Sequence, residues 1–396
     1  MSTSGMSTIG MSTFGESEER QELRRQVARL AGKYGREWFT EKARSGGKTT
    51  DLWLEIAKNG YLGINIPEEY GGGGGGIGDI AAVCEELAAQ GCPLLLMVVS
   101  PAICGTIITR YGTEEQKQRW LPGICDGTGT MAFAITEPDA GTNSHNITTT
   151  ARHDGDGWVL NGRKIWISGI DEADHVLVVA RTEDARTGKL KPCLFVVPID
   201  ADGFEATPIA MEIVSPEKQF QVFLDDVRLP ADALVGDENG GLVQLFAGLN
   251  PERIMAAAFS TGLARFALGK ATAYAKERVV FQGPIGAHQA IAHPLAQSHI
   301  EIELARLMNQ KAAALYDAGD DLGAGEAANM AKYAAAEAAC DAADRAVQTH
   351  GGNGISQEYG MAGLLVATRA GRIAPVSREM ILNFVAMHSL GLPKSY

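Results

Sequence analysis

The stretch Phe133-Ala-Ile-Thr-Glu-Pro-Asp-Ala-Gly-Thr-Asn-Ser144 decides how the rest of the chain is interpreted. It starts as a short apolar strand, breaks at Glu137-Pro138 and ends in small residues that are rich in backbone N–H groups and hydroxyls. Such an exit from a strand can lay its backbone along a flat polar ligand and offer donors to a phosphate. A second stretch, Lys164-Ile-Trp-Ile-Ser168, supplies an indole that could cover an aromatic ring and a hydroxyl that could donate to it. Taken alone, Trp166 fits the core of a β domain better than a ligand site.

The composition sets limits on the class of protein. A chain of 396 residues is too long for one small core, and its net charge of −13 argues against nucleic acid or an anionic membrane as a partner. The six cysteines form no CxxC pair, which predicts reduced, mostly buried thiols of a cytoplasmic protein. No apolar run approaches the roughly 20 residues that span a bilayer. The first fifteen residues repeat Met-Ser-Thr-x-Gly without charge, and we expect a disordered tail rather than a signal peptide.

The spacing of apolar residues divides the rest into three regions, and the expected fold class is a multidomain α+β protein. Residues 16–127 show helical spacing, with helices expected from Leu23 to Tyr34 and over 50–59, 77–90, 101–111 and 114–121. Residues 128–238 alternate and predict a β-barrel-like domain, with strands near 176–180, 194–199 and 220–224 and hairpin turns at 154–157 and at Asn161-Gly162.

Residues 239–396 return to helical spacing and predict a four-helix bundle. Asn250-Pro251 is expected to start a helix that runs to about residue 279, with Asn250 as its N-cap. Further helices are expected over 288–318, 325–350 and 378–390, and long helices with short connections favour an antiparallel bundle.

Several kinds of site find no support. No Ser-His-Asp order and no metal-ligand spacing stand out, so no metal is expected, and no GxGxxG follows a strand. Gly71 to Gly76 cannot hold a regular element and predict a flexible surface loop, which lacks the Lys-Ser/Thr of a P-loop. Arg278 and Gln348-Thr-His-Gly-Gly352 are compatible with phosphate, although an exposed helix-terminal arginine and simple glycine C-caps explain them equally well.

In this order and with these separations, the motifs are specific together. From about Glu16 to the C-terminus the chain resembles the acyl-CoA dehydrogenase family of flavoproteins. The matching stretches are 64–72, 111–117, 133–142, 161–168, 224–230, 278–289 and 348–354. The family fold is an N-terminal helical domain, a β-barrel-like middle domain and a C-terminal four-helix bundle, the layout that the spacing predicts.

The resemblance implies FAD as cofactor and assigns residues to it. The flavin ring would be lined by Phe133, Ile135 and Thr136, covered by Trp166 and approached by Ser168, with Gly141, Thr142 and Ile167 close by. Thr142 would contact the phosphates of FAD or of the acyl-CoA. In this family a neighbouring subunit grips the adenine half, a role that would fall to Arg278, Phe281, Gln289, Gln348, Gly351 and Gly352. Ser377 and Glu379 match further FAD contacts. A cofactor built across an interface implies at least a dimer, and because the family is usually tetrameric, the resemblance predicts a homotetramer, a dimer of dimers.

The catalytic base departs from the common family pattern. Oxidation of an acyl thioester needs a carboxylate in a dry site, where its pKa rises enough for it to take the α proton. Many members place this glutamate where this chain has Pro375, which cannot accept a proton. The long-chain and isovaleryl types carry the base on the helix that starts the bundle, and the match there is Glu252. A helix-start acid that only satisfies the helix dipole is the alternative for Glu252. Arg253 would support Glu252 or contact CoA, and Asn250 would contact the substrate.

The resemblance therefore predicts an FAD-dependent acyl-CoA dehydrogenase that forms a trans-2-enoyl-CoA and passes electrons to an electron-transfer flavoprotein. Two alternatives stay open: an oxygen-reactive acyl-CoA oxidase or flavin monooxygenase-like relative, and a flavin-binding subunit of a hetero-oligomer whose partner supplies the base. The acyl pocket is expected to end near residues 94–99. Gly169 stands where the family often has asparagine, without consequence for FAD binding.

Overall fold

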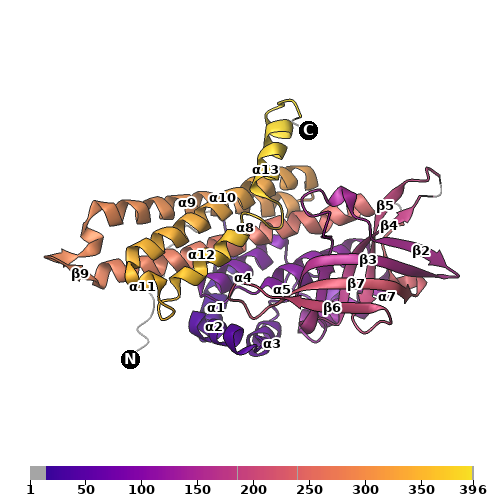
Figure 1. Cartoon of the computed structure of the whole chain (residues 1–396), viewed down its shortest axis with the longest axis horizontal. Coiled ribbons are helices and arrows are strands. Elements are labelled where there is room, and N and C mark those ends of the chain that lie inside the picture. Colours follow the sequence, from indigo (N-terminus) through magenta and orange to yellow (C-terminus); the bar gives the residue numbers. More distant parts are fainter. Residues whose placement is uncertain (1–14, 185, 239, 395–396) are drawn as a thin grey trace.

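The computed structural model describes residues 15–184, 186–238 and 240–394, so most of the tail expected over residues 1–15 lies outside the described residues. Its three regions follow one another along the chain (Figure 1). Helices form the first, a sheet the second and long helices the third, which confirms the α+β fold class.

The first region is helical and is tied to the third by buried charges. It comprises α1 (Glu18–Ala31), α2 (Gly35–Ser45), α3 (Thr50–Lys58), η1 (Glu68–Tyr70), α4 (Ile77–Ala89), α5 (Leu95–Met97), η2 (Val98–Gly105), α6 (Thr106–Tyr111) and α7 (Glu114–Asp126). Glu85 and Glu86 of α4 are 3% and 4% exposed. They form ion pairs of 2.7–2.9 Å with Arg24 of α1, Arg265 of the third region and, through Glu85, Arg306. Because buried charges are costly unless paired, this cluster fixes the packing of the two helical regions.

The second region is an eight-stranded sheet. Its strands are β1 (Met131–Ala134), β2 (Thr150–Asp154), β3 (Gly157–Ser168), β4 (His175–Glu183), β5 (Leu190–Pro198), β6 (Phe204–Ile209), β7 (Gln219–Leu229) and β8 (Leu234–Val235), with the short turns η3 (Ser144–Asn146), η4 (Ile170–Glu172) and η5 (Ala231–Ala233). The order is β6-β7-β3-β2-β4-β5-β8, and β1 pairs in parallel with β4. Alternate residues of β7 are buried in a separate hydrophobic core of the sheet region, which explains why apolar and polar residues alternate along this strand.

The third region consists of long helices that run away from the sheet (Figure 1). They are α8 (Gly241–Glu277), α9 (Gln289–Asp317) and α10 (Asp321–His350), followed by α11 (Gly352–Ile355), α12 (Met361–Ala370), α13 (Arg378–Phe384) and η7 (Val385–Ser389). The small hairpin β9 (Val279–Val280) and β10 (Gly283–Pro284), with η6 (Ile285–Ala287), links α8 to α9. Buried alanines along α10 allow its close approach to α8 and α9.

Two local predictions are wrong, each because tertiary packing overrides a turn or cap signal. Asn161-Gly162 is not a hairpin turn: β3 runs through it, paired with β2 on one side and β7 on the other. A Cβ on Gly162 would lie 2.3 Å from the Thr149 hydroxyl oxygen, so the glycine permits a close approach inside the sheet. Gly71 to Gly76 form an irregular, mostly exposed loop, which confirms that they hold no regular element, and the N–H groups of residues 73, 74 and 75 donate to the carbonyls of residues 63, 66 and 64.

The predicted start of the helix at Asn250-Pro251 is wrong as well. The helix α8 begins at Gly241, and Pro251 lies inside it. Asn250 is no N-cap; its side-chain amide donates to the Asp321 carbonyl at 3.0 Å. The first predicted helix is shifted, since α1 begins at Glu18 and ends at Ala31, before Gly32. The helix expected to start near Pro101 begins earlier, at Leu95.

Candidate active site

A cleft of about 2870 Å³ lies where the three regions meet. Its walls bring together many of the residues predicted for flavin, substrate and base. These are Phe133, Ile135, Thr136, Gly141, Thr142, Trp166, Ile167, Ser168, Asn250, Glu252, Arg253 and Ser377. Leu95, Val98 and Val99, near which the acyl pocket was expected to end, also line it.

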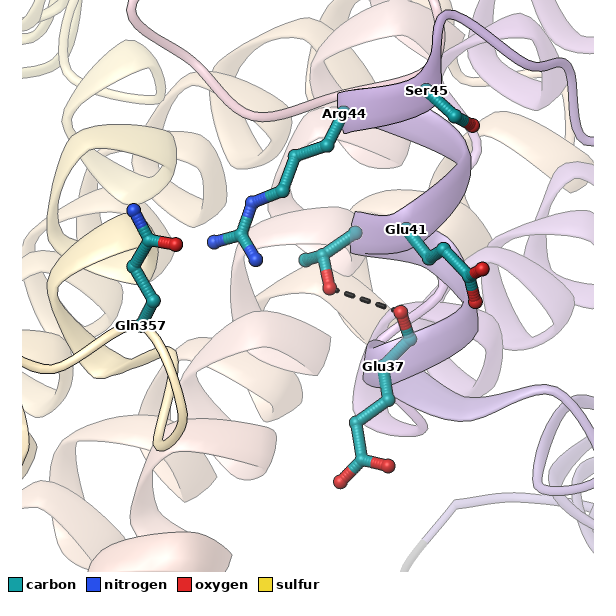
Figure 2. A pocket seen from close by; sticks show the side chains of 6 residues that line it. Glu37, Glu41, Arg44, Ser45 and Gln357 are labelled. Atoms are coloured by element: carbon teal, nitrogen blue, oxygen red, sulfur yellow. Dashed lines mark hydrogen bonds between the residues drawn. The ribbon is translucent and has the colours of Figure 1, made fainter.

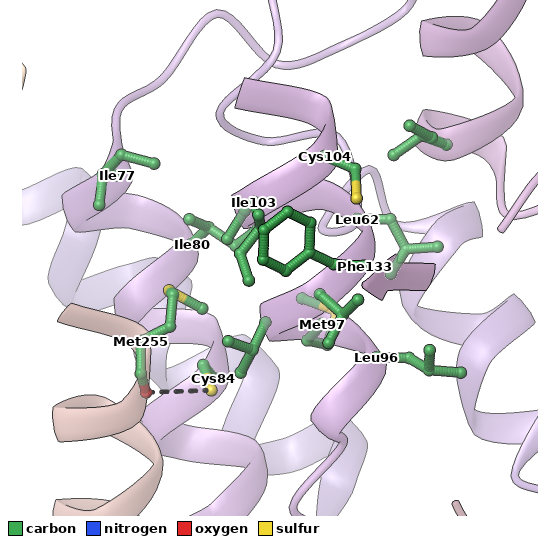
Figure 3. Packing of buried hydrophobic residues seen from close by; sticks show 14 of the residues in the cluster. Leu62, Ile77, Ile80, Cys84, Leu96, Met97, Ile103, Cys104, Phe133 and Met255 are labelled. Atoms are coloured by element: carbon green, nitrogen blue, oxygen red, sulfur yellow. Dashed lines mark hydrogen bonds between the residues drawn. The ribbon is translucent and has the colours of Figure 1, made fainter. Parts of the chain in front are cut away.

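The first wall is the strand β1 and the loop that follows it. Phe133 is 7% exposed, and its ring lies between Ile103 and Met97 of the α5–η2 helix (Figure 3). That packing fixes where β1 ends, and so where Ile135 and Thr136 enter the cleft. The apolar start of the stretch Phe133–Ser144 therefore packs in the core and holds the strand in place, while its polar end faces the cleft.

A buried ion pair joins the quoted stretch to β3. Lys164 is 0% exposed, and its ammonium donates to Glu137 Oε1 at 2.9 Å, to the Ile135 carbonyl at 3.1 Å and to the Val179 carbonyl at 2.7 Å. Glu137 also accepts from the Thr148 hydroxyl and from the N–H groups of Thr148 and Thr149. Burial opposes ionisation of Glu137, but Lys164 and these donors hold its pKa at about 2, and burial lowers the pKa of Lys164 to about 8. The ion pair thus fixes the stretch Phe133–Ser144 against the stretch Lys164–Ser168.

The second wall is the end of β3, where Trp166 has an unusual backbone. Its φ is +62° and its side chain is 52% exposed, although it lines a cleft. An exposed indole on a strained backbone fits a flat ligand that covers it. Beside it, Ile167 is buried in the sheet core, while the Ser168 hydroxyl contacts the side-chain amide of Gln219 on β7, from which it accepts at 2.9 Å.

The candidate base Glu252 lies inside α8, eleven residues from its first residue, Gly241. A helix-start acid is therefore excluded as its explanation. Burial raises the pKa of Glu252 to about 7, while Arg253 and Lys332 pull that pKa down. Arg253 donates to the Leu249 carbonyl and to Asn250 Oδ1 at 3.2 and 3.3 Å, and burial lowers its pKa. A carboxyl group with a pKa near neutrality is suited to take a proton.

The loop that replaces the common base position also faces the cleft. Pro375 lines it, next to Val376, whose carbonyl accepts a hydrogen bond from Lys332. Lys332 is 1% exposed, and burial lowers its pKa to about 8. Ser377 ends this loop as the N-cap of α13, accepting from the Met380 N–H. Lys332 thus holds this loop in place, and at Pro375 the loop presents no carboxylate.

Other predicted residues do not join this cleft within one chain. Glu379 is exposed and pairs with Arg378. The remaining set lies at the opposite end of the long helices from the sheet, around β9 and α11 (Figure 1): Arg278, Phe281, Gln289, Gln348, Gly351 and Gly352. Arg278 follows Glu252 by 26 positions along α8, which corresponds to about 39 Å at the rise of an α-helix. Phe281 is 94% exposed with a φ of +58°.

A second, smaller hollow of about 440 Å³ lies between α2 and Gln357 (Figure 2). Glu37, Glu41 and Arg44 line it, and the Thr40 hydroxyl donates to the Glu37 carbonyl at 3.0 Å. It contains none of the predicted site residues. Within the described residues no group of three or more His, Cys, Asp or Glu side chains could hold a metal ion.

Sequence reasoning missed three residues of the cleft region. Glu137 and Lys164 lie inside the two stretches that it singled out, and the signal was a charge of each sign in otherwise apolar strands. Glu217 lines the cleft, is 5% exposed and accepts hydrogen bonds from the backbone of α5. No local pattern marks Glu217, because its partners are more than 120 residues away in the chain.

Comparison with known proteins identifies the family. Three family models match in sequence order: acyl-CoA dehydrogenase N-terminal domain over residues 17–128, middle domain over 132–227 and C-terminal domain over 239–390. The acyl-CoA dehydrogenase FadE12 of Mycobacterium tuberculosis is 66% identical over 379 residues, which cover 96% of this chain and 98% of the relative.

Solved structures agree with this result. A chain from a study of the electron transferring flavoprotein of Acidaminococcus fermentans is 30% identical, with a TM-score of 0.90 over 96% of this chain and 100% of that chain. A glutaryl-CoA dehydrogenase from Mycobacterium smegmatis in complex with FADH2 is 27% identical, with a TM-score of 0.88 over 96% of both chains. The chain belongs to the acyl-CoA dehydrogenase family.

Proposed function

We propose that Glu252 is the catalytic base that removes the α proton of the acyl-CoA substrate. Membership of the family makes the chain an oxidoreductase that acts on a CH–CH group of an acyl-CoA thioester with FAD as cofactor. The observation that carries the proposal is a carboxyl group in mid-helix, lining the same cleft as Trp166, with a pKa raised to about 7 by burial. Among the described residues its oxygens accept no hydrogen bond, so they are available to a proton.

The proposed reaction removes a proton from the α carbon and a hydride from the β carbon of the acyl group. The Glu252 carboxylate takes the α proton, and the electrons of that C–H bond form the double bond between the α and β carbons. FAD, when bound, supplies the acceptor for the hydride that leaves the β carbon. The product is a trans-2-enoyl-CoA, and Arg253, beside Glu252, stabilises the negative charge that the carboxylate carries before it accepts the proton.

The flavin wall positions the cofactor. Trp166 lines the cleft and is 52% exposed, and the Ser168 hydroxyl, which accepts from Gln219, lies at the same end of β3. The pair Lys164–Glu137 keeps the loop from Ile135 to Thr142 in place against that strand. The exposed Trp166 and the positive φ that presents it fit a flavin ring, and Thr142 would reach the phosphates of FAD or CoA.

We further propose that a second copy completes the FAD site and that the enzyme is a homotetramer. Arg278, Phe281 and Gln289 lie too far from Trp166 to serve the same cleft, and the 94% exposure of Phe281 leaves an apolar ring for a neighbour to cover.

An electron-transfer flavoprotein is the proposed acceptor, fatty-acid β-oxidation the proposed pathway and the cytoplasm the proposed location. The cysteines are free and buried, as a reducing compartment allows. The described residues include no helix long and apolar enough to cross a membrane.

The test is anaerobic titration of the FAD-loaded protein with a panel of acyl-CoAs, following flavin absorbance. We expect wild type to bleach and Glu252→Gln to keep its FAD but not bleach. Glu205→Gln, a substitution on the exposed strand β6, serves as the matched control and should bleach like wild type. Reduction of Glu252→Gln at a rate close to wild type would show that the base is elsewhere. Rapid peroxide formation from substrate without another acceptor would favour an oxidase instead.

A further inference from the structure

Glu217 is a buried acid that the proposed chemistry does not use. It lies in the loop before β7, lines the cleft and is 5% exposed. Its Oε2 accepts from the Leu95 N–H at 2.6 Å and its Oε1 from the Leu96 N–H at 2.8 Å. Both oxygens are thereby occupied by the first turn of one helix, which satisfies two donors that a helix leaves unpaired at its start.

The helix that Glu217 holds forms a wall of the cleft. The segments α5, η2 and α6 are continuous from Leu95 to Tyr111, and Leu95, Val98, Val99 and Ile103 line the cavity. Pro101 lies inside it and the turns from Val98 to Gly105 are widened to the π form. A helix with an internal proline and π turns has fewer regular hydrogen bonds, so its position depends more on outside anchors.

The other side of Glu217 is joined to the flavin wall. The next residue, Lys218, accepts from the Gly169 N–H through its carbonyl at 2.9 Å, and Gln219 pairs with Ser168 between β7 and β3. Gly169 has a φ of +69°, and a Cβ there would lie 2.6 Å from the Leu96 side chain. Leu96 therefore packs directly against the turn that follows Ser168, and the side chains of Leu96 and Met97 lie on the same helix that contacts Phe133 (Figure 3).

We propose that Glu217 is a positioning residue that sets the spacing between the acyl wall, Leu95 to Ile103, and the flavin wall, Trp166 to Ser168. The inference rests on the proposed function, because it assigns the apolar face of that helix to the acyl chain. Through this spacing Glu217 fixes where the α and β carbons stand relative to Glu252 and the flavin, and which length of acyl chain fits behind them.

The acid group suits this task for a physical reason. A carboxyl group without its proton accepts two N–H groups at once, whereas a glutamine in its place would turn an NH2 toward one of them. Burial raises the pKa of Glu217 to about 8, against the pull of its two N–H donors, so the acid is costly where it stands. The hydrogen bonds that its two oxygens accept from the helix offset that cost.

The experiment compares Glu217→Gln with Asp317→Asn in the FAD-loaded enzyme. Asp317 makes the same kind of contact, accepting from the N–H groups of Ile77 and Gly78 at 2.7 and 3.0 Å at the start of α4, but it does not line the cleft. Three readouts are needed: the flavin absorption spectrum without substrate, the rate of anaerobic flavin reduction at saturating acyl-CoA across straight chains of increasing length, and the melting temperature.

We expect Glu217→Gln to alter the flavin spectrum, to shift the preferred chain length and to slow reduction roughly 10- to 100-fold, the effect of a misplacement of about 1 Å. Asp317→Asn should lower the melting temperature and leave the other two readouts unchanged. Glu217→Asp keeps the acid but shortens its reach by one methylene. If spacing is what Glu217 controls, this variant shows the same shift in chain length.

Two results would overturn the inference. One is a Glu217→Gln enzyme that melts earlier but keeps the wild-type spectrum, rate and chain-length preference. The other is a Glu217→Asp enzyme identical to wild type in all three readouts. If no acyl-CoA reduces even the wild-type flavin, the proposed function fails, whereas the flavin spectra of the variants still decide whether Glu217 positions the flavin wall.

Discussion

Removal of the Lys164 ammonium tests whether one buried ion pair holds the flavin wall. In Lys164→Met the Glu137 carboxylate would remain buried with its Thr148 and Thr149 donors, but without its cation. The carbonyls of Ile135 and Val179 would also lose their donor. The methionine fills most of the same volume, so the substitution probes the charge and its hydrogen bonds rather than a cavity.

The expected cost is that of a buried charge without its partner. Against the effect of burial, Lys164 and the Thr148 and Thr149 donors hold the pKa of Glu137 at about 2, so the variant loses one of the groups that keep this buried carboxylate ionised. The two carbonyls that lose their donor cost about 1 kcal/mol each. Removal of one partner of a buried pair costs about 3–5 kcal/mol, because it leaves an uncompensated buried charge.

The assay has two parts, denaturant unfolding followed by tryptophan fluorescence and titration of the apoprotein with FAD. Because the Ile135 carbonyl that loses its donor belongs to the loop that the ion pair holds against the flavin wall, FAD affinity should fall by about tenfold, which corresponds to about 1.4 kcal/mol of binding free energy. The control is Lys33→Met, which removes the lysine of an exposed pair with Glu55 and should cost under about 1 kcal/mol. If Lys164→Met is no less stable than Lys33→Met and binds FAD like wild type, the ion pair does not hold this wall.

The remaining predictions concern Glu252 and the far end of the helices. Because burial raises the pKa of Glu252 to about 7, kcat/KM should rise with pH through about 7, and a profile that is flat from pH 5 to 9 would contradict this. The neutral form is favoured by folding, so the stability that Glu252 contributes is full below its ordinary pKa of 4.5 and is lost as pH rises through about 7. Glu252→Gln should therefore be more stable than wild type at pH 8, by at most about 3 kcal/mol, and not at pH 4.5, as judged by denaturant unfolding. Phe281→Ser should weaken FAD binding and subunit association together in analytical ultracentrifugation with absorbance detection at the flavin band; unchanged values for both would exclude Phe281 from the interface.

The sequence predicted the fold class because each region keeps one spacing of apolar residues over many positions. It also predicted most of the cleft wall, since Phe133 to Thr142 and Trp166 to Ser168 are contiguous in the chain and need only two strands to meet. Whether these residues contact FAD stays a prediction.

The failures share a physical cause. The turn signal of Asn161-Gly162 and the cap signal of Asn250-Pro251 are local preferences worth about 1 kcal/mol, and pairing with two strands or packing of a long helix outweighs them. Glu217 had no signal at all, because its role exists only once β7 and the helix from Leu95 are side by side. Contacts between distant segments cannot be deduced from one sequence by spacing.

Glu217 and Glu252 both line the cleft, and their hydrogen-bond partners differ in a way that favours Glu252 as the proposed base. Each Glu217 oxygen accepts one backbone N–H group, from Leu95 and from Leu96, so this carboxyl group is tied to the helix that begins at Leu95. Glu252 accepts no hydrogen bond from the described residues, so its lone pairs are free to take a proton. Burial raises its pKa to about 7, and the nearby charges of Arg253 and Lys332 act against that rise. If Glu252 is the base as proposed, the chain tolerates Pro375 because the carboxylate stands on α8 instead. Lys332 then connects the two positions, since it donates to the Val376 carbonyl while its charge acts on Glu252.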